Sequence, residues 1–161
     1  MKILIKQAKI IDSSSKYNNK ICDILINNNK IEKVAKKIQI DSDTKIFKSD
    51  NLHVSQGWFD IHVNFGQPGF EHRETIENGL NVAAKGGFTE VLLMPNTKPC
   101  VDNGSIIDFI KSFDKKHIVN IQVAGNLTMS QEGKNIVEVN DMINNGCIAF
   151  TDDKKSIQNN E

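Results

Sequence analysis

The sequence predicts an α/β fold in which a parallel sheet of four strands, with helices between them, follows a small β-rich unit. From Gly57 onward, apolar strand patterns alternate with helical patterns at a spacing of about thirty residues, which is typical of a parallel sheet with right-handed crossovers. Before Gly57, short apolar segments are separated by polar turns rich in Asn and Ser. We therefore expect two domains, at residues 1–55 and 56–161.

The first domain is predicted to consist of short strands. Apolar residues between Ile3 and Ile11 indicate one or two strands, and residues 44–47 indicate another. The apolar segments 22–26 and 31–34 flank three consecutive asparagines. Because asparagine tolerates the positive φ of a tight turn, these two segments predict a β-hairpin.

The second domain is predicted from two alternating patterns. Strands are expected at residues 61–65, 90–94, 119–124 and 147–150. Helices are expected at residues 75–85, 105–113 and 135–144, with Ser105 as an N-cap and glycines as stop signals. Four such strands fit either an open doubly wound sheet or the first half of an eight-stranded barrel. No Gly-x-Gly-x-x-Gly follows the first of them, which disfavours a dinucleotide-binding fold.

Composition excludes several classes of partner. The 20 Lys and Arg residues balance 20 Asp and Glu residues, so net charge gives no reason to expect nucleic acid or an anionic membrane. No apolar segment approaches the roughly 20 residues that span a bilayer. Cys22, Cys100 and Cys147 are odd in number and widely spaced, which favours a reducing cytoplasm over a disulfide framework.

Polar residues stand at the ends of the predicted strands, where α/β barrels build their active sites. His62 is either a zinc ligand or a structural histidine. The pair Asp152 and Asp153 either binds a metal or forms a turn or helix cap. Asn96 and Asn126 each end a strand, and each either donates to a substrate or closes an Asx-turn.

Five collinear segments form the most specific pattern in the chain. They are residues 57–65 (GWFDIHVNF), 67–79 (QPGFEHRETIENG), 83–89 (AAKGGFT), 94–99 (MPNTKP) and 146–153 (GCIAFTDD). Together they resemble the dihydroorotases of the amidohydrolase superfamily. The resemblance implies the first half of a TIM-type (β/α)8 metal-dependent hydrolase barrel, preceded by part of a small β-rich composite sandwich domain. It also implies interconversion of N-carbamoyl-aspartate and dihydroorotate, small-molecule substrates in pyrimidine biosynthesis.

The resemblance implies a zinc site built on the strand ends. His62 corresponds to the first of two histidine ligands, and Asn64 stands at the position of the second, where an amide is a weak replacement for imidazole. One of Asp152 and Asp153 corresponds to the acidic ligand of the fourth strand. With so few ligands, we expect zinc binding to be weak or absent in this chain.

On the substrate side, Asn96 corresponds to a residue that binds the substrate carboxylate. Gly66 stands where the family carries an arginine for the same carboxylate, and the loss of that pair is worth roughly 1.5–3 kcal/mol. Two further histidines and the general base of the family would lie later in the chain. We therefore expect no catalytic residue within this sequence.

The length of 161 residues is short of the roughly 250 that such a barrel needs. The chain is therefore expected to be a fragment, or a half barrel that associates with a second copy or with the remainder of the barrel through its exposed edges. Two alternatives to a dihydroorotase stay open. One is a catalytically dead scaffold or partner subunit, as Asn64 and Gly66 suggest, and the other is a relative of the hydantoinase or allantoinase type.

Overall fold

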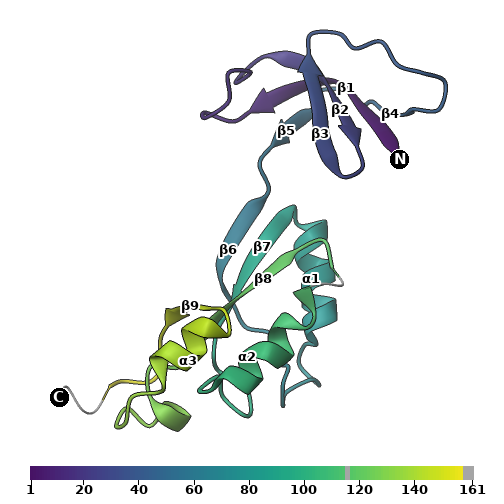
Figure 1. Cartoon of the computed structure of the whole chain (residues 1–161). Coiled ribbons are helices and arrows are strands. Elements are labelled where there is room, and N and C mark those ends of the chain that lie inside the picture. Colours follow the sequence, from purple (N-terminus) through teal and green to yellow (C-terminus); the bar gives the residue numbers. More distant parts are fainter. Residues whose placement is uncertain (115–116, 158–161) are drawn as a thin grey trace. The chain divides into compact units, whose positions relative to one another are not determined.

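The structure, a computed structural model, describes residues 1–114 and 117–157. It divides into two compact units, Met1–Gln56 and Gly57–Glu161, whose elements are labelled in Figure 1. The last four residues of the predicted second domain lie outside the described part. No helix within that part is long and apolar enough to cross a membrane.

The first unit is a five-stranded mixed sheet. Its path runs β3 (Lys30–Ala35), β2 (Ile21–Asn27), β1 (Lys2–Ile11) and β4 (Lys45–Phe47), and β5 (His53–Ser55) pairs farther along β1. The predicted hairpin is confirmed, because β2 and β3 pair antiparallel with Asn27 opposite Lys30. Asn28 and Asn29, at φ 48° and 62°, supply the left-handed turn between them. The short strand β5 was not predicted.

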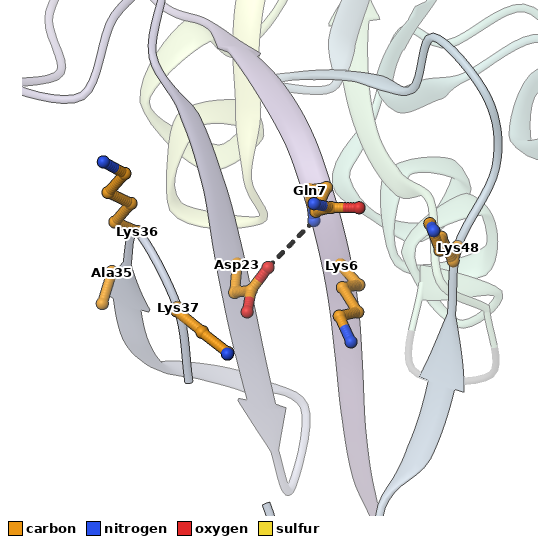
Figure 2. Close-up of a pocket in the computed structure, with 7 residues that line it drawn as sticks. All are labelled: Lys6, Gln7, Asp23, Ala35, Lys36, Lys37 and Lys48. Carbon is orange, nitrogen blue, oxygen red and sulfur yellow. Dashed lines mark hydrogen bonds between the residues drawn. The ribbon is translucent and has the colours of Figure 1, made fainter. Parts of the chain in front are cut away.

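A buried carboxylate joins three segments of this unit. Strand β1 changes register between Ile5 and Ala8, and Gln7 lies there at φ 56°. Asp23 on β2, which is 1% exposed, accepts hydrogen bonds from the backbone N–H groups of Gln7 at 2.9 Å and Ile38 at 3.0 Å. Figure 2 shows Asp23 beside Gln7. Both residues line a cavity of about 840 Å³, together with four lysines. The carboxylate thus holds the bulge of β1 and the chain after β3 against β2.

The second unit is a parallel sheet in the order β6-β7-β8-β9. The strands are β6 (Trp58–Val63), β7 (Phe88–Leu93), β8 (Asn120–Gly125) and β9 (Cys147–Phe150). The segments that join them contain α1 (Ile76–Lys85), α2 (Gly104–Lys111), the 3-10 turn η2 (Met129–Gln131) and α3 (Val139–Asn144). The predicted alternation of strands and helices is therefore confirmed.

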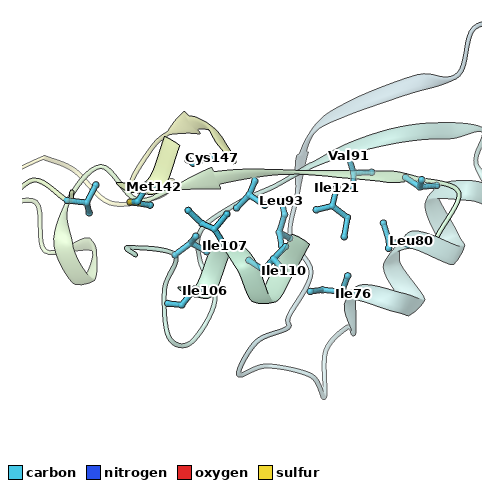
Figure 3. Packing of buried hydrophobic residues seen from close by; sticks show 14 residues of the cluster. Ile76, Leu80, Val91, Leu93, Ile106, Ile107, Ile110, Ile121, Met142 and Cys147 are labelled. Atoms are coloured by element: carbon cyan, nitrogen blue, oxygen red, sulfur yellow. The ribbon is translucent and has the colours of Figure 1, made fainter. Parts of the chain in front are cut away.

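The core of this unit lies between the sheet and its helices, as Figure 3 shows. Val91 and Ile121 from the strands pack with Leu80 and Ile107 from the helices, and each is at most 1% exposed. Burying one such side chain contributes about 1.5–3 kcal/mol. Because successive residues of a strand point to opposite faces, the neighbouring side chains face away from the helices. These include a polar pair in which Gln122 donates to Glu90.

Several boundaries differ from those predicted, and the clearest differences are at β6, α2 and α3. Strand β6 begins at Trp58 and ends at Val63, so residues 64–65 lie beyond it. The N-cap of α2 is Asn103, which accepts from the N–H groups of Ser105 and Ile106, and not Ser105 itself. Helix α3 begins at Val139 and not at residue 135, because Ile136 forms a β-bridge with Thr128 instead of entering the helix.

We expect Asp23→Ala to lower the free energy of unfolding by roughly 3 kcal/mol, since it removes two charge-assisted hydrogen bonds and leaves buried N–H groups unpaired. The matched control is Asp41→Ala, whose highly exposed carboxylate only contacts Lys2 and should contribute less than about 1 kcal/mol. Urea denaturation of both variants measures the difference. Equal losses would contradict the structural role given to Asp23.

Candidate active site at the carboxyl ends of the parallel strands

The parallel sheet brings together four side chains that are far apart in sequence. His62 lies near the end of β6, Asn64 just beyond it, Asn96 after β7 and Asp153 after β9. The amide nitrogen of Asn96 donates to Asn64 Oδ1 at 2.5 Å and to Asp153 Oδ2 at 2.9 Å. His62 Nε2 lies 3.6 Å from Asp153 Oδ1. We call these four residues the strand-end cluster.

His62 and Asp153 differ sharply in their exposure to solvent. The His62 side chain is 53% exposed, because β6 is an edge strand of the sheet, whereas the Asp153 side chain is 6% exposed. The backbone N–H of His62 donates to Asp60 Oδ1 at 3.0 Å, which ties the histidine to its own strand. The cluster therefore combines the buried carboxylate of Asp153 with the solvent-exposed imidazole of His62.

Asp152 has a different role from Asp153. It is 3% exposed and accepts hydrogen bonds from the N–H groups of Leu127 at 2.9 Å and Thr128 at 3.0 Å, from the Thr128 hydroxyl, and from the Asn126 amide at 3.5 Å. Burial raises the pKa of the Asp152 carboxyl, but the hydrogen bonds from Thr128 and Leu127 outweigh it, so the pKa lies below its ordinary value. Its oxygens are thus committed to the loop after β8.

The turn after β9 aims Asp153 at the cluster. Asp153 has φ 51°, in the left-handed region that aspartate tolerates better than most residues, and its N–H donates to Thr151 Oγ1. The N–H of Thr151 in turn donates to Gly125 O at 2.9 Å, which extends the pairing of β9 with β8. Of the two adjacent aspartates, Asp153 is the one that faces His62.

Asn126 lies in the loop after β8 and is not part of the cluster. Its side chain is fully buried and donates to Asp152, and its backbone N–H donates to Val101 O at 2.7 Å. Its amide oxygen is a buried acceptor without a partner in the described part of the chain. These contacts assign Asn126 to the support of Asp152.

A cavity of about 320 Å³ adjoins the cluster. Its lining includes two residues, Arg73 and Lys154, that the sequence did not predict to belong to the site. Asn64, Gly66, Phe70 and Asn96 also line it. The Arg73 guanidinium carbon lies 4.5 Å from the centroid of the Phe70 ring. Two cations therefore lie beside the strand ends. The only sequence signal for Arg73 was its place in the loop that follows β6, where barrel enzymes carry functional residues.

The described residues do not complete a zinc site. His62 Nε2 and Asp153 Oδ1 have a separation that two ligands of one tetrahedral zinc would show, given bonds of about 2.0–2.2 Å. A catalytic zinc has about three protein ligands, however, and the oxygen of Asn64 already accepts from Asn96. Within residues 1–114 and 117–157, no group of three His, Cys, Asp or Glu side chains could hold a metal.

Residues 52–161 match the family model described as Dihydro-orotase-like. The chain belongs to the dihydro-orotase-like family. It is 39% identical over 151 residues to the dihydroorotase of Clostridioides difficile (strain 630) and 38% identical over 160 residues to that of Pelotomaculum thermopropionicum. The alignments cover 94% and 99% of this chain but only 36% and 37% of those relatives, so the chain spans little more than a third of their length.

Solved structures identify the architecture. An L-hydantoinase (dihydropyrimidinase) from Arthrobacter aurescens matches with a TM-score of 0.75 at 19% identity, over 92% of this chain and 32% of that one. A dihydroorotase matches with a TM-score of 0.59 at 15% identity, over 89% and 38% of the two chains. The fold predicted from the sequence, part of an amidohydrolase TIM barrel with an N-terminal β-rich unit, is thereby confirmed. Members of these families are generally metal-dependent.

The two adjacent aspartates provide a direct test of the geometry. We expect Asp152→Asn to lower the free energy of unfolding by about 2–3 kcal/mol, because an amide cannot accept all the hydrogen bonds that Asp152 accepts. Asp153→Asn keeps a residue that tolerates positive φ and should cost less than about 1 kcal/mol. Urea denaturation of both variants measures the two losses. If Asp153→Asn were the more destabilising change, the structural role given to Asp152 would be wrong.

Proposed function

We propose that the strand-end cluster is part of a dihydroorotase-type active site, which interconverts dihydroorotate and N-carbamoyl-aspartate by opening and closing a cyclic amide. The observation that carries the proposal is the convergence of His62, Asn96 and Asp153 at the carboxyl edge of the sheet. Membership in the dihydro-orotase-like family supports the choice of this reaction for the cluster. We infer that the described residues carry only part of the catalytic set.

In this proposal His62 and Asp153 are two ligands of a zinc ion, and Asn64 is a weak third donor in place of a histidine. Asn96 fixes the orientation of Asp153 and contacts the substrate. The set is too small for zinc to be held by these residues alone. We therefore assign no general base and no catalytic step to this chain, and expect it to be inactive without further ligands.

A second candidate is a catalytically silent relative that acts as a scaffold or partner subunit. It is favoured by the hydrogen bonds of Asn96, which engage both the Asn64 oxygen and one oxygen of Asp153. The Asn64 oxygen is the third donor that a metal would need. A hydantoinase-type substrate has less support, because the likeness to the L-hydantoinase is at 19% identity and concerns the fold alone.

One prediction of the proposed function concerns activity. With zinc added, the purified protein should open dihydroorotate no faster than buffer does, because a third strong ligand is missing from the described residues. Chromatographic separation of dihydroorotate from N-carbamoyl-aspartate measures the rate. Turnover that disappears in His62→Ala would show that the residues present already form a working site.

Another prediction of the proposed function concerns zinc binding. Asn64→His adds an imidazole beside His62 and Asp153, so we expect zinc affinity to rise at least tenfold in competition with a chromophoric chelator. Asn140→His, an exposed replacement on α3, controls for the addition of any surface histidine. If the two variants bind zinc equally, the strand-end cluster is not a latent metal site.

A further inference from the structure

The cavity beside the strand-end cluster combines positive charge with amide groups. Arg73 and Lys154 line it, Asn64 and Asn96 form part of its wall, and none of its described lining residues is acidic. Within the part of the chain that the structure describes, neither Arg73 nor Lys154 forms an ion pair. Two cations therefore face a common space without a protein anion between them.

The loop after β6 holds Arg73 in this position. The N–H of Gly66 donates to Glu74 O at 3.0 Å, the N–H of Phe70 donates to Gly66 O at 2.7 Å, and the N–H of Arg73 donates to Phe70 O at 2.9 Å. The guanidinium then stacks on the Phe70 ring. These backbone hydrogen bonds close the loop on itself, and the Phe70 ring supports the Arg73 side chain.

Gly66 is required for this closure. A Cβ atom at position 66 would lie 2.1 Å from the carbonyl oxygen of Phe70, which is far inside van der Waals contact. Since the obstacle is backbone and not a flexible side chain, no larger residue fits while the loop keeps this shape. The positive charge beside the strand ends can therefore come from Arg73 but not from position 66.

We propose that Arg73 and Lys154 bind a carboxylate group of a small acidic ligand in this cavity. The guanidinium presents a planar pair of donors suited to a carboxylate, and the ammonium adds a second charge. Because Asn64 and Asn96 belong to both the cavity and the cluster, a ligand held by its carboxylate extends toward His62 and Asp153. The identity of the ligand as N-carbamoyl-aspartate rests on the proposed function, whereas the selection for a carboxylate does not.

Isothermal titration calorimetry with N-carbamoyl-L-aspartate and with its neutral diamide tests the proposal on the purified protein. We expect binding of the acid but not of the diamide, and weaker binding as salt rises, because partly exposed charges are screened. Arg73→Gln and Lys154→Gln should each raise the dissociation constant about tenfold or more, and Arg73→Lys should restore part of the loss.

Lys98→Gln is the matched control, since Lys98 is an exposed cation on the neighbouring loop that does not line the cavity. Thermal unfolding of each variant shows whether its fold is intact. Absent binding of the acid, equal binding of the diamide, or an unchanged dissociation constant in the folded Arg73→Gln, Lys154→Gln double variant would overturn the proposal. Binding of the acid by a protein in which Asn64→His gains no more zinc affinity than Asn140→His would support the carboxylate site and count against the hydrolase, so the two can fail separately.

Discussion

The buried carboxylate of Asp152 is the interaction on which the geometry of the candidate site depends. Strand β9 is short, and Asp152 joins the chain that leaves it to the loop after β8 through hydrogen bonds from Asn126, Leu127 and Thr128. A charge removed from water is stable only when such donors surround it. With Asp152 held in this way, the next residue turns through a positive φ and Asp153 faces His62. Asp152, whose oxygens accept only structural hydrogen bonds, thus determines the position of Asp153 in the strand-end cluster.

Hydrogen bonds from Asn96 hold the strand-end cluster together. Asp153 is nearly buried, and a buried carboxylate requires either a cation or hydrogen-bond donors. Asn96 supplies a donor to Asp153 and uses its second N–H for Asn64. An asparagine at position 64 therefore completes a hydrogen-bonded network that joins the ends of three strands. A metal bound by the Asn64 oxygen would have to displace the hydrogen bond that this oxygen accepts from Asn96.

Much of the fold follows from local patterns in the sequence. Alternation of strand and helix predicts a parallel sheet, and parallel strands bring their carboxyl ends to one edge, so His62, Asn96 and the aspartate pair were expected to meet. The choice between Asp152 and Asp153 could not be made in advance. The two residues are chemically identical neighbours, and only the backbone turn decides which one faces the cluster. Likewise, the start of α3 depends on a bridge between Thr128 and Ile136, which is a tertiary contact.

Arg73 could not be predicted from the sequence as a site residue, for a related reason. The resemblance to the family places the carboxylate-binding arginine at position 66, which is Gly66 in this chain. Binding of a carboxylate depends on where a cation lies in space and not on its position in the sequence. The closed loop between Gly66 and Glu74 excludes a side chain at its start and orders Arg73 near its end, above the Phe70 ring. Stacking at an exposed site contributes only about 0.5–1 kcal/mol, but it limits the rotamers that the long side chain samples. In a short loop closed at Gly66, a cation at position 73 can therefore lie beside the same strand ends as a cation at position 66 would.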